Sequence, residues 1–188
     1  MKKVGIFYGS TTGATEGVAE TIAARLGVAS EDIHNVGTTK VDEVDKYDVL
    51  LLGSSTWGIG ELQDDWNDFL DKLKAKNLSG KTVAIFGCGD SASFGGSFCD
   101  AIGIIYNELQ GSGCQFAGSV DTDGYSYDSS EACVDGQFVG LPLDESNESD
   151  QTDKRIDAWI SGLKQVICCP KVCVALPVLL DPHKGTGL

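Results

Sequence analysis

The chain has 188 residues, of which 14 are Lys or Arg and 28 are Asp or Glu, so its formal net charge is −14 at pH 7. This length suits one domain with a sizeable core, and no apolar run reaches the roughly 18 residues that a membrane-spanning helix needs. The negative charge excludes nucleic acid and anionic membranes as partners and makes a basic protein surface the complementary one. That the acidity only maintains solubility is the competing interpretation.

The first fifteen residues predict a strand, a hydroxyl-rich loop and the start of a helix over 13–26. The apolar run from Val4 to Tyr8 leads into Gly-Ser-Thr-Thr-Gly-Ala-Thr at 9–15. Such a loop offers backbone N–H groups, hydroxyl donors and the positive end of a helix dipole, which together favour a phosphate group. No basic residue occurs between Val4 and Arg25, and neither a Walker loop nor a GxGxxG fingerprint is present. A plain Ser/Thr-rich helix cap is the competing interpretation.

Strands and helices alternate along the next part of the chain. Strands are predicted at 33–36, 47–53, 82–86 and 115–120, and helices at 64–80, 98–109 and 152–166, with a brief helix around 41–44. The alternation, together with the continuously apolar run 49–52, predicts a parallel sheet covered by helices on both faces. Residues 121–149 lack helical periodicity and predict a β-rich excursion with short strands near 125–127 and 137–141.

Residues 168–188 differ in character from the rest of the chain. They hold three of the four prolines and three cysteines beside the apolar run 172–180. We expect an extension outside a core domain at 1–167, and we favour an incidental tail over a cysteine-based metal or redox site.

The cysteines do not form a recognisable metal or disulfide pattern. The seven are scattered without CxxC pairs or histidine partners: Cys88, Cys99, Cys114, Cys133, Cys168, Cys169 and Cys173. This arrangement matches neither a zinc site nor a thioredoxin motif. Because residues 1–3 lead into a strand without a signal peptide, we expect a cytoplasmic location with reduced thiols. We expect both histidines, His34 and His183, at the surface.

Three predicted loops, at 9–15, 54–61 and 87–96, lie at the carboxyl edge of the sheet, where open parallel sheets bind ligands. Trp57 and Phe94 each stand among glycines and polar residues in these loops, where no core is available for an aromatic side chain. We therefore expect the two rings to hold a planar aromatic ligand beside the phosphate site, which describes a flavin mononucleotide (FMN) site. That the rings only cover the sheet edge is the competing interpretation.

Four segments of the chain resemble the long-chain flavodoxins of bacteria and algae. They read IFYGSTTGATE at 6–16, TWGIGEL at 56–62, FGCGD with DAIG at 86–90 and 100–103, and TDGY with FVGLPLD at 122–125 and 138–144. The resemblance runs from residue 2 to about 166. It implies a flavodoxin-like, doubly wound, five-stranded parallel sheet whose fifth strand is interrupted by the 121–149 insertion. The tail 168–188 has no counterpart in the family pattern.

The resemblance also implies the cofactor contacts. The FMN phosphate would lie on Ser10, Thr11, Thr12, Gly13, Ala14 and Thr15, the ring between Trp57 and Phe94, and the pyrimidine edge near Asp90 and the Cys88–Gly89 backbone. Further cofactor-binding positions are Ser55, Thr56, Gly58, Ile59, Gly60, Gly87, Ser97, Phe98 and Cys99. Three positions depart from the family pattern: Phe94 replaces the usual tyrosine, Ala14 a larger polar residue, and Ser146 an acidic one.

The implied function is a low-potential, one-electron carrier that uses the semiquinone/hydroquinone couple of non-covalently bound FMN, between a reductase or photosystem-type donor and an acceptor enzyme. No catalytic residue and no metal are then expected. The Gly58–Ile59 peptide would turn the Gly58 carbonyl toward N5–H of the flavin. Acidic residues, among them Glu61, Asp64, Asp65 and Asp90, would disfavour an anionic reduced ring.

The implied partners are transient, basic-surfaced redox proteins, such as flavodoxin or ferredoxin reductases and an electron acceptor, and we expect a monomer. One alternative is an FMN-dependent, two-electron quinone or nitro reductase on the same fold. Another is a cofactor-free signalling module such as a receiver domain, which would need an acidic cluster where this chain has Gly9-Ser10-Thr11.

Overall fold

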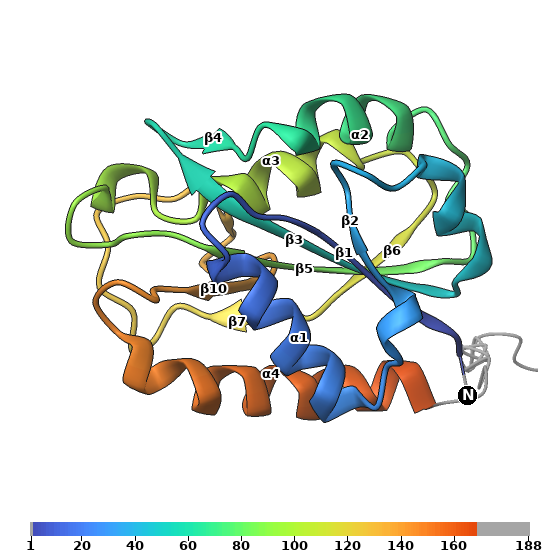
Figure 1. Cartoon of the computed structure of the whole chain (residues 1–188). Coiled ribbons are helices and arrows are strands. Elements are labelled where there is room, and N and C mark those ends of the chain that lie inside the picture. Colours follow the sequence, from blue (N-terminus) through green and yellow to red (C-terminus); the bar gives the residue numbers. More distant parts are fainter. Residues whose placement is uncertain (1, 169–188) are drawn as a thin grey trace, which may run out of the picture.

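A parallel sheet lies at the centre of the computed structural model, which describes residues 2–168 (Figure 1). Its strands lie in the order β10-β5-β3-β1-β2, and β6 also pairs with β5. Their bounds are Val4–Gly9 (β1), Ile33–Asn35 (β2), Val49–Trp57 (β3), Thr82–Cys88 (β5), Gln115–Ala117 (β6) and Leu141–Leu143 (β10). The continuously apolar runs predict this position, because the central strands β3 and β5 are buried on both faces of the sheet.

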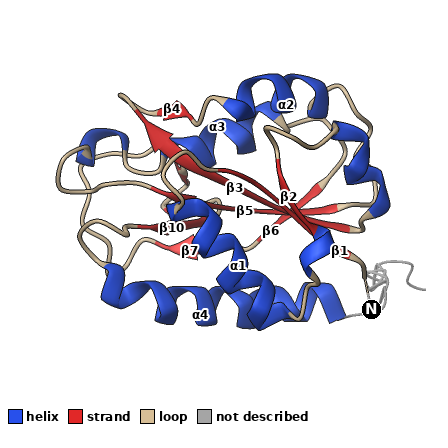
Figure 2. Cartoon of the chain, in the orientation of Figure 1, coloured by secondary structure: helices blue, strands red, loops and turns tan. Residues whose placement is uncertain are grey.

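Helices cover both faces of the sheet, as expected for a doubly wound fold (Figures 1 and 2). Helices α1 (Ala14–Leu26) and α4 (Ser149–Cys168) pack on one face and α2 (Asp65–Leu73) and α3 (Asp100–Glu108) on the other. Short 3₁₀ turns occupy Ser30–Asp32 (η1), Val41–Lys46 (η2) and Gly95–Ser97 (η3). Each face buries its own apolar cluster, so the sheet separates two cores.

The fifth strand of the sheet is split in two. β6 pairs with Thr82 to Ala84 and β10 pairs with Phe86 to Cys88, both parallel to β5. Between them, β7 (Val120–Asp121), β8 (Cys133–Val134) and β9 (Gln137–Phe138) form a separate antiparallel sheet. The prediction of a fifth strand interrupted by a β-rich insertion is confirmed.

The prediction of a short strand at 125–127 in the insertion is wrong. No strand forms there; the rings of Tyr125 and Tyr127 instead pack on Phe138, with ring centroids 5.1 Å apart in both cases. Phe98 from the loop before α3 joins this aromatic cluster. The aromatic residues that resemble a strand pattern thus serve packing rather than strand pairing.

Three helices have boundaries that differ from those predicted by the hydrophobic pattern. The helix predicted to run to residue 80 ends at Leu73, and Leu78 is buried from the turn that follows. The helix predicted from residue 98 begins at Asp100, because Cys99 adopts a left-handed conformation with φ +56°. The last helix is longer than predicted and begins at Ser149.

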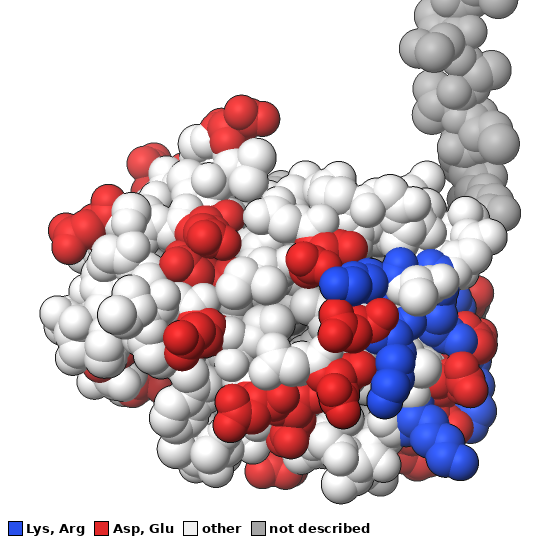
Figure 3. Space-filling model, turned by 90° about the horizontal axis from the view of Figure 1, so that it is seen from above, with Lys and Arg blue, Asp and Glu red and all other residues white. Residues whose placement is uncertain are grey.

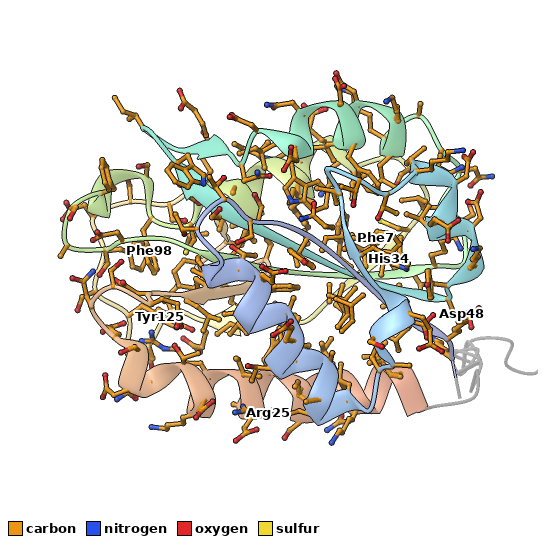
Figure 4. The ribbon with its side chains drawn as sticks, in the orientation of Figure 1. Phe7, Arg25, His34, Asp48, Phe98 and Tyr125 are labelled. Carbon is orange, nitrogen blue, oxygen red and sulfur yellow. The ribbon has the colours of Figure 1, made fainter. Side chains whose placement is uncertain are left out.

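His34 lies on the edge strand β2 and is half-buried, so it is less exposed than expected. Its ring stacks on Phe7 with centroids 4.8 Å apart (Figure 4). Its Nε2 lies 2.6 Å from the hydroxyl of Tyr47, which donates to Asp32 at 2.9 Å. Burial lowers the pKa of His34. His183 lies outside the described residues.

Two further features concern the chain as a whole. Between residues 2 and 168, none of the helices combines the length and the apolar character needed to cross a membrane. Cys88, Cys99, Cys114 and Cys133 carry free thiols. The tail predicted at 168–188 lies, apart from the end of α4 at Cys168, outside the described residues.

Candidate cofactor-binding site

The loop between β1 and α1 presents free backbone N–H groups at the carboxyl edge of the sheet. Gly13 is the N-cap of α1, and no side chain caps the helix. Its φ of +92° is a left-handed conformation that glycine adopts without a steric penalty. The Gly13 N–H donates to Ser10 Oγ at 3.1 Å. The interpretation as a plain Ser/Thr helix cap therefore fails, and the uncapped helix N-terminus is the kind of position that binds anions.

Thr15 adds a buried hydroxyl at the same place. The residue is 0% exposed, and its Oγ1 has no hydrogen-bond partner among the described residues. The thiol of Cys88 lies nearby: burial raises its pKa to about 12, with a smaller opposing effect from Thr15. Sulfur is a weak hydrogen-bond partner. A buried hydroxyl without a good partner costs about 1–3 kcal/mol, so this position is explained if a ligand atom accepts its hydrogen bond.

The second loop is the tip of a hairpin. β3 extends to Trp57 and pairs antiparallel with β4 (Glu61–Leu62). Trp57 is 40% exposed, and its indole N–H donates to Ser55 Oγ at 2.9 Å. Gly58 has a φ of +54°, and a Cβ there would collide with the carboxylate of Glu61. Only glycine fits this position without strain.

The third loop is a tight turn built on Asp90. Its carboxylate accepts hydrogen bonds from the N–H groups of Ala92 at 3.1 Å and Ser93 at 2.8 Å. The Phe94 N–H donates to the Asp90 carbonyl at 2.9 Å. The bond from the Ser93 N–H, with further bonds from Asn147 and Ala92, lowers the pKa of Asp90. The turn presents Phe94 to solvent, with 52% of its surface exposed.

The three loops meet around one cavity of about 310 Å³. Its walls are Thr12 and Ala14 from the first loop, Ser55, Thr56, Trp57 and Gly58 from the second, Cys88, Gly89, Asp90, Phe94 and Ser97 from the third, and Glu145 and Ser146 after β10. The structure thus brings together residues that are far apart in sequence and that were predicted to bind one ligand. Trp57 and Phe94 both belong to the wall, as the predicted aromatic pair requires.

Other predicted residues lie beside this cavity rather than in its wall. Ser10, Thr11 and Gly13 belong to the first loop, Thr15 to the first turn of α1, Ile59 and Gly60 to the hairpin tip, and Gly87 to β5. Ile59 is 90% exposed. The side chains of Phe98 and Cys99 are buried in the core, and the Cys99 thiol lies 3.7 Å from the carbonyls of Gly87 and Leu143. Phe98 and Cys99 could therefore contact a cofactor through their backbone atoms but not through their side chains.

Glu145 is a wall residue that the sequence-based site did not include. It follows β10, the second half of the split fifth strand, so it lies at the same carboxyl edge as the three loops. The end of the fifth strand could have indicated it, but the insertion concealed where that strand ends.

The surroundings of the cavity are acidic. No Lys or Arg belongs to its wall as the described residues form it, whereas Asp90 and Glu145 do. Asp100 lies close to Gly60, and burial raises the pKa of its carboxyl. On the face seen in Figure 3, the Lys and Arg side chains gather at the right-hand end, away from the loops on the left in Figure 1, while Asp and Glu are spread over the whole face, the loop end included.

The strand order and the position of the cavity define a class of protein. The chain runs outward from β1 to β2 in one direction and from β3 to β5 in the other, so the strand order reverses between β1 and β3. The first two loops follow these strands. Ligands of open α/β sheets bind at this reversal, and the chain is therefore a doubly wound α/β protein with a ligand site at its switch point.

Comparison with known proteins identifies the family. A sequence profile described as Flavodoxin matches residues 6–159. Flavodoxin 1 of Azotobacter vinelandii is 47% identical over 169 residues, which are 88% of this chain and 97% of that protein. Flavodoxin of Nostoc sp. strain PCC 7120 is 44% identical over 163 residues, or 87% of this chain and 96% of that protein. A crystal structure of Fusobacterium nucleatum flavodoxin bound to FMN is 34% identical, has a TM-score of 0.82, and covers 89% of this chain and 99% of that one.

The chain belongs to the flavodoxin family. Flavodoxins are electron-transfer proteins rather than enzymes, and they pass electrons to redox partners. The chain is therefore an electron carrier, as the resemblance of its motifs predicts, and the reductase alternative is not favoured.

Proposed function

We propose that the chain binds FMN non-covalently in the cavity between the three loops and carries single electrons at low potential. The observation that carries this proposal is the convergence of two aromatic side chains, Trp57 and Phe94, on the cavity that adjoins the uncapped N-terminus of α1. The buried, unpartnered hydroxyl of Thr15 fits a phosphate acceptor at the same helix end.

Each loop then has its own task in binding. The N–H groups and hydroxyls of residues 10–15 hold the phosphate with neutral donors. Trp57 and Phe94 enclose the two faces of the ring, and Asp90 with the Cys88–Gly89 backbone meets its polar edge. FMN, when bound, supplies one-electron chemistry that no amino-acid side chain of the site offers.

The surrounding residues set the potential. The cavity wall includes the carboxylates of Asp90 and Glu145 and, among the described residues, no cation. Negative charge that accumulates on a ligand here is therefore disfavoured, which makes the fully reduced protein a strong reductant. The positive φ of Gly58 supports the proposal that the Gly58–Ile59 peptide turns its carbonyl toward the flavin, because glycine changes conformation at little cost.

The acidic loop end fits transient partners with basic surfaces, such as flavodoxin or ferredoxin reductases. The lysines at the other end are largely neutralised: Lys74 pairs with Asp71 and Glu108, and Lys76 with Asp42 and Asp45. Electron transfer to a basic partner should slow as the salt concentration rises from about 0.01 to 0.5 M, because screening shortens the reach of the charges. A rate constant that does not change over this range in stopped-flow experiments would show that electrostatic attraction does not guide the partner to the acidic loop end.

We further propose a monomeric, cytoplasmic protein in which residues 1–167 form the FMN-binding domain, 121–149 the insertion, and 168–188 an extension. The free thiols of Cys88, Cys99, Cys114 and Cys133 fit a reducing compartment.

The decisive experiment is reconstitution followed by photoreduction. Apoprotein titrated with FMN should quench the flavin fluorescence with one-to-one stoichiometry, and reduction should pass through a stable one-electron form visible in the absorbance spectrum. Direct bleaching in one two-electron step would favour the reductase. An apoprotein that does not take up FMN would refute the proposed site.

A further inference from the structure

Asn147 joins two carboxylates that come from separate loops at the cavity. Its Nδ2 lies 2.9 Å from Oδ1 of Asp90, in the turn after β5. The same atom lies 3.0 Å and 2.9 Å from the two carboxylate oxygens of Asp144, which follows β10. A primary amide has two N–H groups, so Asn147 uses one on each carboxylate. Hydrogen bonds to charged acceptors are stronger than those between neutral groups.

Asp144 is the fixed end of this connection. It is 0% exposed and accepts further hydrogen bonds from the Ser91 N–H at 2.9 Å, the Ser91 hydroxyl at 2.6 Å, and the N–H groups of Ser146 and Asn147 at 3.1 and 2.9 Å. Burial alone would raise its pKa, but the bonds from Ser91 and Asn147 outweigh burial and lower it. Asp144 is thus an ionised, fully bonded anchor at the end of the fifth strand.

Asp90 is the end that lies in the cavity wall. Its carboxylate organises the turn that carries Phe94 into the cavity wall. Asn147 itself does not belong to that wall. Two sets of hydrogen bonds therefore connect Asp144, at the end of the fifth strand, with the turn that holds one of the two aromatic side chains. One set runs through Asn147 to Asp90, and the other comes directly from Ser91.

We propose that Asn147 is a positioning residue that holds the 90–94 turn, and with it Phe94, against the flavin ring without touching the ring. The inference rests on the proposed FMN site. Without Asn147, the carboxylates of Asp90 and Asp144 would face each other with no shared donor. The two hydrogen bonds from Ser91 to Asp144 would remain, but the Asp90 end of the turn would lose its connection to Asp144. Phe94 would then enclose the ring less completely and admit water to it.

The test compares Asn147→Ala with wild type and with Asn67→Ala. Asn67 is a matched control, because it lies at an exposed position of α2 and its side chain makes one hydrogen bond, to the Asp64 carbonyl at 3.2 Å. We expect Asn147→Ala to weaken FMN binding about tenfold, the equivalent of one charge-assisted hydrogen bond, and to shift the second reduction step to a less negative potential. Asn67→Ala should change neither. A purely structural role for Asn147 would lower the apoprotein melting temperature and leave the potential unmoved.

A double-mutant cycle tests whether Asn147 acts through Asp90. If it does, Asn147→Ala should weaken FMN binding less than about twofold in an Asp90→Ala background, because coupled residues are not additive. An equal tenfold loss in both backgrounds, or an unchanged affinity and potential, would overturn the inference. Asn147→Ser, which keeps a polar side chain too short to bridge, is measured in parallel should the alanine variant fold poorly. Wild type that binds no FMN would refute the proposed function, whereas wild type that binds normally beside an unaffected Asn147 variant would refute this inference alone.

Discussion

Replacing Thr15 by valine should change protein stability and cofactor affinity in opposite directions. The substitution keeps a β-branched side chain of similar volume and removes the buried hydroxyl that has no hydrogen-bond partner among the described residues. Thr and Val have similar helix propensities, so the first turn of α1 should be little affected. The substitution therefore tests the contribution of the Thr15 hydroxyl alone.

The magnitudes follow from what the hydroxyl does in each state. Without ligand, removing an unsatisfied buried hydroxyl relieves a penalty of about 1–3 kcal/mol, so the apoprotein should gain about 1 kcal/mol or more in its free energy of unfolding. With FMN, the variant loses a hydrogen bond to a phosphate, worth about 1.5–3 kcal/mol. FMN should therefore bind about ten- to a hundredfold more weakly.

Two titrations measure these effects. Urea unfolding of the apoprotein gives the stability, and quenching of flavin fluorescence gives the affinity for FMN and for riboflavin, which lacks the phosphate. Riboflavin affinity should be unchanged. Thr21→Val is the matched control on the same helix, since the Thr21 hydroxyl donates to the Gly17 carbonyl at 2.8 Å. A less stable Thr15→Val apoprotein, or equal losses for FMN and riboflavin, would refute the reasoning.

Three further predictions address the ring and the acidic anchor. Phe94→Ala should weaken FMN binding about tenfold through lost stacking, measured by the same quenching; an unchanged affinity would place the ring elsewhere. Gly58→Pro fixes φ at about −65°, where the structure has +54°, and should lower the yield of one-electron-reduced FMN on photoreduction; an unaltered yield would show that the 58–59 peptide does not stabilise this form. Because the pKa of Asp144 is lowered in the folded chain, its carboxylate stabilises the fold at neutral pH, and this contribution is lost as pH falls below the ordinary value of 3.8. Asp144→Asn should therefore lose less stability than wild type between about pH 5 and pH 2 in thermal unfolding, and parallel curves would contradict this.

The layers of the fold were predictable from local patterns, because buried parallel strands and amphipathic helices leave clear periodicities. Leu50, Leu51 and Leu52 indicate a central strand, and Trp66, Phe69 and Leu70 indicate the buried face of α2. The short strands of the insertion were not predictable in the same way. Tyr125 and Tyr127 satisfy a strand pattern, yet their rings are needed to cover Phe138. Tertiary packing decides such segments.

The candidate site likewise has parts that local sequence patterns predict and parts that depend on tertiary packing. Its loops could be located because the carboxyl ends of parallel strands share one edge, and Trp57 and Phe94 stand out among polar neighbours. The role of Thr15 was visible only as part of a motif, since burial without a partner is a property of the folded chain. The connection through Asn147 had no sequence signal at all, because it joins residues separated by 57 positions.

Because the fifth strand is split, the insertion could be removed without changing the register of the strands in the sheet. Its packing against the rest of the molecule would be lost. Ala117 pairs with Ala84 and Leu141 with Phe86, so a single residue opposite Ile85 would make the strand continuous, and Gly140 already lies against the Ile85 carbonyl. A chain could gain or lose residues 118–139 without shifting any strand beside β5. Such an exchange would alter the cover over α3, where the backbone of Glu131 lies against Gly103. It would also alter the third loop of the site, because the Gly95 carbonyl accepts hydrogen bonds from the N–H groups of Asp128 and Ser129 at 2.9 and 3.0 Å. The insertion is therefore interchangeable in strand register alone, because it packs on the core through the buried Phe138 and supports the loop that carries Phe94.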